Sequence, residues 1–365
     1  MTEIDDIRVG ILGCGDVLGR YVPGLRRYPE LRIVRCADID TDRARKAAEE
    51  FGIPASGSPD ELLADSEVDL VVNLTPPVFH AATTAQALTA GKHVYVEKPI
   101  ATTVEDALDL FALAHKHDRL LGSATDTFLG SAPQTARAAI DGKRIGEPIA
   151  VTVFVPHSKV ETRHPDPTAF FGPGGGPLLD LGPYYIGSLV SLLGPVTHVY
   201  GATRRGADQR VVTSPQRRVD TVPVNVDTHA TAVLRFASGV LGTVMMSFEV
   251  WDHHLPHAEI YGTEGTLSLP WPLNYDGDVT LKRHEDPDWQ VLEPVVAPVA
   301  APGPDQFLRG RGVRDMAGAL AGGPLRVGAE LGLHVFEILD AIEASGRDNA
   351  VIALRSTCAR PAPVE

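Results

Sequence analysis

The stretch IRVGILGCGDVLGR, Ile7 to Arg20, decides the fold of the first third of the chain. It begins as a strand that is apolar on both faces and then reaches Gly13, Gly15 and Gly19, where a helix is expected to open. Glycines at such a turn let the backbone approach a pyrophosphate at the positive end of the helix. Leu18 occupies the third glycine position of the strict G-x-G-x-x-G pattern, so the match is imperfect, and the glycines could serve turn geometry alone.

Apolar runs and helical patterns alternate after this stretch. We expect strands at 31–37, 69–74, 93–97 and 119–124, and helices at 18–27, 41–51, 79–90 and 103–116. Thr41 and Thr103 are the expected N-caps of two of these helices. Strands without a polar face are typical of a parallel sheet covered by helices, so the pattern predicts a doubly wound α/β domain over residues 1–125.

The pattern changes after about residue 124. A helix at 132–141 and a strand at 147–155 precede a loop at 157–177 that is rich in proline and glycine. Alternating strands are expected at 196–202, 221–236, 239–250, 258–269 and 278–283, with a turn at Gly262 to Thr266, before helices at 306–321 and 329–344. A chain of 365 residues favours two domains, so we predict an α+β domain with a mainly antiparallel open sheet over residues 126–365.

Composition excludes several classes of protein. The chain has 33 Lys+Arg against 47 Asp+Glu and a net charge of −14, which disfavours nucleic acid as a partner. Its three cysteines, Cys14, Cys36 and Cys358, are too few and too scattered for a disulfide framework or a zinc site, so we expect a reducing, cytoplasmic setting. The start of the chain lacks the features of a signal peptide, and no run reaches the roughly 18 apolar residues of a membrane span, so we expect the mature protein to begin at or near Met1.

A carboxylate closes the second expected strand. Asp38 could accept hydrogen bonds from both hydroxyls of an adenosine ribose and would repel a 2′-phosphate. No Arg or Lys follows immediately, so NAD is favoured over NADP. The alternative is that Asp38 or Asp40 only caps the helix that starts near Thr41.

The third apolar run ends in NLTPPVFH, which places Asn73, Thr75, Pro76 and His80 near the next helix start. Ligands of open α/β sheets bind outside the carboxyl ends of the strands, so this edge should flank the nicotinamide half of the cofactor. His80 could equally be an ordinary helix residue.

Four further segments carry a family resemblance: GCGDVLG, TPPVFHAATTAQALTAGKHVYVEKP, GGGPLLDLGPYY and EIYGTEGTL. They resemble the Gfo/Idh/MocA family of oxidoreductases, which includes glucose-fructose oxidoreductase and inositol dehydrogenases, over nearly the whole chain. The resemblance implies an N-terminal Rossmann domain, a C-terminal domain whose open sheet forms homodimers or homotetramers, and hydride transfer between NAD(P) and a sugar or polyol hydroxyl. The cofactor contacts expected on this basis are Gly13, Gly15, Asp16, Val17, Leu18, Asp38, Ile39, Asn73, Thr75, Pro76, His80, Glu97 and Lys98.

The resemblance also implies the catalytic residues. The family's catalytic lysine corresponds to Lys98 of the Glu97-Lys98-Pro99 motif, where it would bind the reacting hydroxyl. The family's Asp-x-Gly-x-His motif reads Asp180-Leu181-Gly182-Pro183-Tyr184 here, so a phenol replaces the usual imidazole. A phenol with a pKa near ~10 is a poorer base at neutral pH than an imidazole near ~6.5.

We therefore predict that Lys98 and Tyr184 together handle the substrate proton while Asp180 positions the hydroxyl and supports Lys98. The alternative for Asp180 is a helix N-cap, with Pro183 in the first turn. Tyr185 is expected in the core.

Substrate binding is expected from the loop at 157–177, with Lys159, Arg163 and His164 as candidates if the loop is not merely solvated. His253 and His254 alternate across a strand and so do not favour a metal site, although one of them could line the pocket. The expected function is an NAD-dependent dehydrogenase or ketoreductase acting on a sugar, glycoside or cyclic polyol. The alternatives are an NAD-dependent glycosidase with no net redox change and a non-catalytic NAD-sensing regulator.

Overall fold

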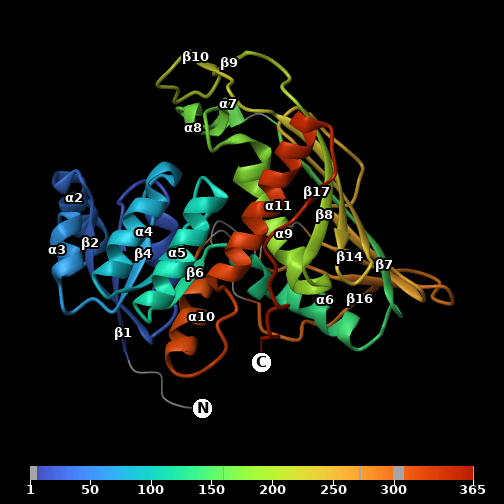
Figure 1. Cartoon of the computed structure of the whole chain (residues 1–365), viewed down its shortest axis with the longest axis horizontal. Coiled ribbons are helices and arrows are strands. Elements are labelled where there is room, and N and C mark those ends of the chain that lie inside the picture. Colours follow the sequence, from blue (N-terminus) through green and yellow to red (C-terminus); the bar gives the residue numbers. More distant parts are fainter. Residues whose placement is uncertain (1–5, 159, 271–272, 274, 299–307, 365) are drawn as a thin grey trace. The chain divides into compact units, whose positions relative to one another are not determined.

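The structure, a computed structural model, describes residues 6–158, 160–270, 273, 275–298 and 308–364. The chain divides into two compact units, the first made of Met1–Asp126 and Phe307–Leu333 and the second of Thr127–Gln306 and His334–Glu365 (Figure 1). The segment 307–333, which the sequence assigned to the second domain, therefore belongs to the first unit. Its backbone is bonded to the strand that ends at Ser123: the amide of Ser123 donates a hydrogen bond to the carbonyl oxygen of Val327 at 2.9 Å.

The first unit contains one six-stranded sheet in the order β3-β2-β1-β4-β5-β6, and all its strand pairs are parallel. This is the strand order of a Rossmann fold, and it confirms the predicted doubly wound sheet. Strand β3 was not predicted, because its three residues are half-buried and carry no apolar run. The strands are β1 (Ile7–Leu12), β2 (Leu31–Ala37), β3 (Ala55–Gly57), β4 (Leu70–Asn73), β5 (His93–Val96) and β6 (Leu121–Ser123).

Helices connect these strands, and N-caps were predicted for two of them. Thr103 caps its helix as predicted, accepting a hydrogen bond from the amide of Asp106 at 3.0 Å. The prediction for Thr41 was wrong, because Asp40 takes the N-cap position and accepts from the amide of Arg43 at 3.1 Å. The helices are α1 (Leu18–Leu25), α2 (Thr41–Phe51), α3 (Pro59–Ala64), η1 (Pro77–Phe79), α4 (His80–Thr89), α5 (Val104–Lys116) and α10 (Arg311–Leu320).

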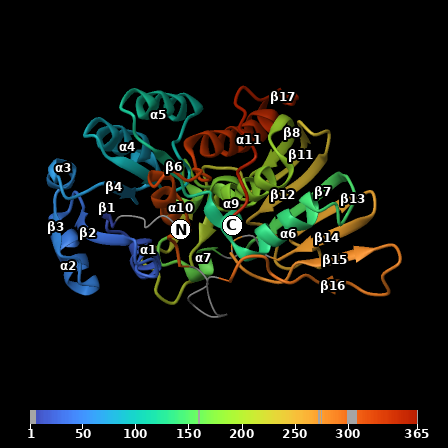
Figure 2. The same cartoon turned by 90° about the horizontal axis from the view of Figure 1, so that it is seen from below.

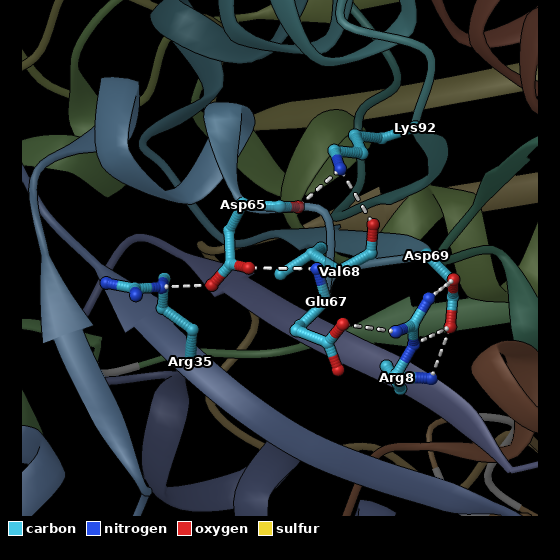
Figure 3. Close-up of polar contacts among 7 residues, drawn as sticks. All are labelled: Arg8, Arg35, Asp65, Glu67, Val68, Asp69 and Lys92. Atoms are coloured by element: carbon cyan, nitrogen blue, oxygen red, sulfur yellow. Dashed lines mark hydrogen bonds and ion pairs between the residues drawn. The ribbon is translucent and has the colours of Figure 1, made fainter.

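A polar network fastens the amino ends of three parallel strands, the edge opposite the expected cofactor site (Figure 3). Arg8 of β1 pairs with Asp69, just before β4, with a shortest side-chain distance of 2.7 Å. Lys92, just before β5, is only 8% exposed and donates to the carbonyl oxygens of Asp65 at 2.6 Å and Val68 at 2.8 Å. These ammonium hydrogen bonds satisfy two backbone acceptors, so the network has a structural role.

The second unit is built on a nine-stranded sheet in the order β16-β15-β14-β13-β7-β12-β11-β8-β17, part of which can be followed in Figure 2. Among the described strand pairs of this sheet only β7 with β12 is parallel, so the predicted mainly antiparallel sheet is confirmed. The strands are β7 (Pro148–Pro156), β8 (Val196–Arg204), β11 (His229–Phe236), β12 (Leu241–Ser247), β13 (Ala258–Gly262), β14 (Gly265–Leu269), β15 (Thr280–Arg283), β16 (Gln290–Val291) and β17 (Ile352–Ala353), with a separate pair β9 (Gln209–Val211) and β10 (Thr221–Pro223).

Helix α9 (Gly176–Leu193) forms much of the core of this unit. A Cβ added at Gly182 would lie 2.6 Å from Leu339 and 3.2 Å from Met246, so glycine lets α9 pack closely on α11 (Ala329–Asp348) and β12. Tyr185 is 1% exposed, which confirms its place in the core. The other helices are η2 (Asp126–Leu129), α6 (Ser131–Asp141), α7 (Val160–Arg163) and α8 (Thr168–Phe171). None of the helices, as far as the described residues go, is long and apolar enough to cross a membrane.

Candidate functional site

The glycine turn after β1 has the shape that a dinucleotide needs. Gly13 has a φ of +101°, and an added Cβ would lie 2.7 Å from the carbonyl carbon of Leu74, so the turn passes directly against the end of β4. In contrast, a Cβ at Gly15 or Gly19 would meet nothing within 4 Å. Val17, at the N-cap of α1, makes no side-chain cap hydrogen bond. The turn thus leaves space beside the start of a helix, which fits a pyrophosphate.

Asp38 stands at the end of β2 and is only 6% exposed. Its two oxygens accept backbone hydrogen bonds from Cys14 and Asp40, both at 2.9 Å, so the glycine turn itself orients this carboxylate. The N-cap of α2 is Asp40, so Asp38 does not serve as the helix cap. A ribose hydroxyl that binds this carboxylate would share its oxygens with these two amides.

Arg43, in the first turn of α2, is a neighbour that the sequence reading missed. One of its guanidinium nitrogens lies 3.4 and 3.5 Å from the oxygens of Asp38, and another lies 3.6 Å from Asp40. The sequence reading considered only basic residues directly after Asp38, whereas the helix brings this one back from five positions further along. Ile39, between the two acids, is 92% exposed.

Asn73 closes β4 and is fully buried. Its amide nitrogen donates to the hydroxyls of Thr83 at 2.8 Å and Thr84 at 3.0 Å, and its oxygen accepts from the hydroxyl of Thr75 at 2.8 Å. This amide therefore ties the strand end to α4. Thr75 is half-buried and Pro76 is exposed.

The Glu97-Lys98-Pro99 motif follows β5, and its Lys98-Pro99 peptide bond is cis. Glu97 is 7% exposed, and its carboxylate accepts hydrogen bonds from the hydroxyl of Tyr21 at 2.9 Å and from the amide of Lys98 at 2.8 Å. The side chain of Lys98 is half-buried. His80 is 1% exposed, and both its ring nitrogens lie against backbone carbonyl oxygens. Glu97 and His80 thus hold the backbone that carries Lys98.

In the second unit, Asp180 is the fifth residue of α9 and Gly175 is the N-cap. The reading of Asp180 as a helix cap is therefore wrong, and Pro183 lies inside the helix rather than in its first turn. The helix begins before Asp180, at Gly176, which has a φ of +83°. Asp180 is half-buried and Tyr184 is 5% exposed, and their spacing of four puts both on one side of α9.

His157 lies directly after β7, and the sequence reading did not single it out. Its amide donates to the carbonyl of Ser247 at 2.7 Å, and its ring lies edge-on to Phe248 with 6.2 Å between centroids. Burial lowers the pKa of His157 and the guanidinium of Arg163 lowers it further, whereas the charge of Asp180 raises it. An imidazole thus lies within electrostatic reach of the Asp-x-Gly-x-Tyr motif, and its position after a strand end was the only available sequence signal.

The predicted substrate loop has local partners of its own. The guanidinium of Arg163 contacts the ring of His157, and His164 accepts a hydrogen bond from the amide of Asp166 at 3.2 Å while packing against Phe170. Lys159 lies outside the described residues. The rings of His253 and His257 are 5.9 Å apart, and no group of three or more potential metal ligands occurs within the described ranges.

Comparison with known proteins covers both units. The sequence model described as "Oxidoreductase family, NAD-binding Rossmann fold" matches residues 7–125, and the "GFO/IDH/MocA C-terminal domain" matches residues 134–268. A dTDP-3,4-didehydro-2,6-dideoxy-alpha-D-glucose 3-reductase of Actinomadura kijaniata is 30% identical over 95% of this chain and 98% of its own. A D-xylose 1-dehydrogenase (NADP(+)) of Haloferax volcanii is 28% identical over 94% of this chain and 99% of its own.

Among solved structures, levoglucosan dehydrogenase in complex with NADH and levoglucosan superposes with a TM-score of 0.81 at 20% identity, covering 96% of this chain and 100% of its own. At that identity the likeness concerns the fold. Together with the matches to both domains and the similarity over almost the full length of the reductase, these findings show that the chain belongs to the Gfo/Idh/MocA family of oxidoreductases.

Proposed function

We propose that this oxidoreductase transfers a hydride between the nicotinamide of NAD and a secondary hydroxyl of a sugar, glycoside or cyclic polyol. The observation that carries the proposal is the shared sheet edge: the glycine turn, Asp38 and Lys98 directly follow the carboxyl ends of β1, β2 and β5. At that edge of an open parallel sheet a dinucleotide and a reacting group meet. The named activities of the relatives, a sugar reductase and a sugar dehydrogenase, support the substrate class.

The choice of NAD over NADP rests on Asp38. Its carboxylate is fixed by two backbone amides, so it cannot easily turn away from a 2′-phosphate. Arg43 acts against this preference, because its guanidinium lies beside the same carboxylate. Titration calorimetry with NAD and NADP decides the matter, and we expect Asp38→Ala to weaken NAD binding and to reduce the preference for NAD. Tighter binding of NADP than NAD by the natural protein would contradict the assignment.

We propose Lys98, Asp180 and Tyr184 as the catalytic residues. In this proposal Lys98 binds the reacting oxygen and stabilises the alkoxide that develops as hydride leaves, and Asp180 orients the hydroxyl. Tyr184 shares the proton with Lys98, so Tyr184→Phe should lower kcat and change the pH profile. Near-normal turnover of Tyr184→Phe at every pH would reduce the phenol to a packing role. Arg163 and His164 remain proposed substrate contacts, and Arg163→Ala should raise the KM for the sugar more than it lowers kcat.

The experiment that tests the function is a substrate screen. Purified protein with NAD is offered inositols, aldoses and glycosides in turn, and NADH formation is followed by its absorbance alongside product analysis. We expect one mole of NADH for each mole of ketone formed, with Lys98→Ala abolishing the signal. Cleavage of a glycoside without NADH would contradict the dehydrogenase assignment and favour a glycosidase, and tight NAD binding without any turnover would favour a regulator.

We also propose that the outer face of the nine-stranded sheet mediates homodimers or homotetramers. The face carries exposed apolar side chains on neighbouring strands, with Tyr200 of β8 paired to Val233 of β11, and Leu241 on β12. Light scattering should report a dimer or tetramer that Val233→Glu dissociates, and a monomer in the natural protein would refute this. A cytoplasmic setting is likewise proposed, because Cys14, Cys36 and Cys358 are all buried thiols.

A further inference from the structure

His80 begins α4 and is almost completely buried, with 1% of its surface exposed. Its Nδ1 lies 2.6 Å from the carbonyl oxygen of Pro99, and its Nε2 lies 2.7 Å from the carbonyl oxygen of Thr75. Thr75 follows β4 and Pro99 follows β5, two strands that are neighbours in the parallel sheet. The ring therefore spans two strand ends on the edge where the nicotinamide is proposed to bind.

The chemistry of these two contacts restricts the protonation state of the ring. A carbonyl oxygen can only accept a hydrogen bond, so each ring nitrogen must carry a proton in order to bond its partner. A neutral imidazole carries one proton and would place the lone pair of its second nitrogen against an oxygen at hydrogen-bond distance. Both contacts are favourable only when the ring is doubly protonated.

We propose that His80 is a positioning residue whose doubly protonated ring ties the segment carrying Lys98 to the end of β4. The tie acts on Lys98 from its C-terminal side, through the carbonyl of Pro99. On the N-terminal side, the carboxylate of Glu97 binds the amide of Lys98 and is itself held by the hydroxyl of Tyr21. Lys98 thus projects from a backbone that is fixed on both sides.

Two charged groups act on the ring, both from the segment after β5. The carboxylate of Glu97 favours the charged ring and the ammonium of Lys98 disfavours it, while burial lowers the pKa of His80 and the two carbonyl contacts counter that shift. Because burial is the largest of these effects, the ring is expected to be doubly protonated, and to make both hydrogen bonds, only on the acid side of neutrality. One of the two hydrogen bonds is then lost as pH rises. The hydrogen bond from the amide of Lys98 to the carboxylate of Glu97 does not involve the ring of His80, so it persists when the ring loses its proton.

The chain offers a matched control in His93. This ring is also partly buried, in the same unit, but its Nδ1 accepts a hydrogen bond from the amide of Leu120 at 2.9 Å. A nitrogen that accepts cannot carry a proton, so His93 must be neutral wherever this contact exists. The two histidines should therefore differ in a measurement of ring protonation on a single sample.

The test is nuclear magnetic resonance of the full-length protein labelled with ¹⁵N at histidine, titrated across the pH range in which it stays folded. We expect two protonated ring nitrogens for His80 in the acid part of the range and one for His93 throughout. The backbone amide of Lys98 should shift with the same midpoint as the ring of His80. A ring of His80 that keeps one unprotonated nitrogen at every pH would overturn the proposal, as would an amide of Lys98 that ignores its titration.

Two neutral variants separate the contacts. Asn at position 80 can place an amide near the position of Nδ1, and Gln can place one near Nε2, so His80→Asn should retain the contact with Pro99 and His80→Gln the contact with Thr75. The amide of Lys98 should remain near its acid-form position in His80→Asn but not in His80→Gln, and neither variant should show the pH-dependent shift. If the amide of Lys98 had the same position in both variants, the proposal that the contact with Pro99 positions Lys98 would be refuted.

A kinetic readout rests on the proposed function and is kept separate from the resonance test, which needs no substrate. With a sugar identified by the screen, we expect His80→Gln to lower kcat about 10- to 100-fold, the scale of a small misplacement of a reacting group, with a much smaller effect on NAD affinity. His93→Asn should leave kcat unchanged. Equal losses in both variants would show a general structural effect and refute a specific role of His80 in positioning Lys98.

Discussion

Replacing Gly13 with alanine should damage the first unit before any question of catalysis arises. The residue has a φ of +101°, where an L side chain costs about 1–3 kcal/mol. The added Cβ would lie 2.7 Å from the carbon and 2.8 Å from the oxygen of the Leu74 carbonyl, and 2.8 Å from the nitrogen of Thr75. These are backbone atoms that no rotamer change can move, so overpacking adds about 1–3 kcal/mol. We expect Gly13→Ala to lower the free energy of unfolding by about 2–6 kcal/mol.

Gly15→Ala is the matched control for this substitution. Its Cβ would meet nothing within 4 Å and its backbone is not in the positive-φ region, so the free energy of unfolding should change by no more than about 0.5 kcal/mol. If the open space at Gly15 is where the pyrophosphate approaches, NAD affinity should fall at least about tenfold, or ~1.4 kcal/mol. The two glycines thus separate a stability effect from a binding effect.

The assay is urea denaturation followed by far-ultraviolet circular dichroism, with NAD binding measured by calorimetry under native conditions. Gly13→Ala should move the urea midpoint down with little change of slope, because the surface exposed on unfolding stays the same. An unchanged midpoint would refute the close approach of the glycine turn to β4. Unimpaired NAD binding by Gly15→Ala would refute the placement of the pyrophosphate beside this turn.

Three further substitutions test features away from the proposed chemistry. Lys92→Met should cost about 2–4 kcal/mol in urea denaturation, because the carbonyls of Asp65 and Val68 lose a buried ammonium donor; a neutral result would refute the role of the network. Asp40→Ala removes the N-cap of α2 and should lower the free energy of unfolding by about 1 kcal/mol in the same assay. Asp42→Ala is the control, because Asp42 lies in the first turn of α2 but is not the N-cap. Burial lowers the pKa of His334 to about 4, so its contribution to stability is present above the unfolded pKa near ~6.5 and is lost as pH falls toward 4. The urea midpoint of the natural protein should therefore fall across that window by more than that of His334→Asn, and parallel curves would contradict this.

Much of the first unit was predictable because its strands are short apolar runs bounded by turn residues. Residues 7–12, 31–37 and 93–97 were read as strands almost to the residue, since most residues of each run are apolar and buried. The helix cap was placed one residue late, because Thr41 and Asp40 are equally good capping types and only the backbone conformation distinguishes them.

Long-range contacts were not predictable from sequence spacing. The parallel pairing of β7 with β12 joins strands that are far apart in the chain, and nothing in their alternation distinguishes it from an antiparallel pairing. Arg43 and His157 were missed for a related reason: a helix turn and a strand end bring them beside Asp38 and within the field of Asp180, respectively. Periodicity gives the face of an element, whereas the neighbours of that face depend on the fold.

The return of residues 307–333 to the first unit has a consequence for biosynthesis. Until that segment has left the ribosome, Gly122 lacks its close neighbour Met316, Gly24 lacks the backbone of Arg309, and the amide of Ser123 lacks its acceptor. The N-terminal unit is therefore completed late in translation, after the strands of the nine-stranded sheet up to β16 have been synthesised. A nascent chain stalled before residue 307 would expose the edge strand β6, which makes it a natural target for chaperones.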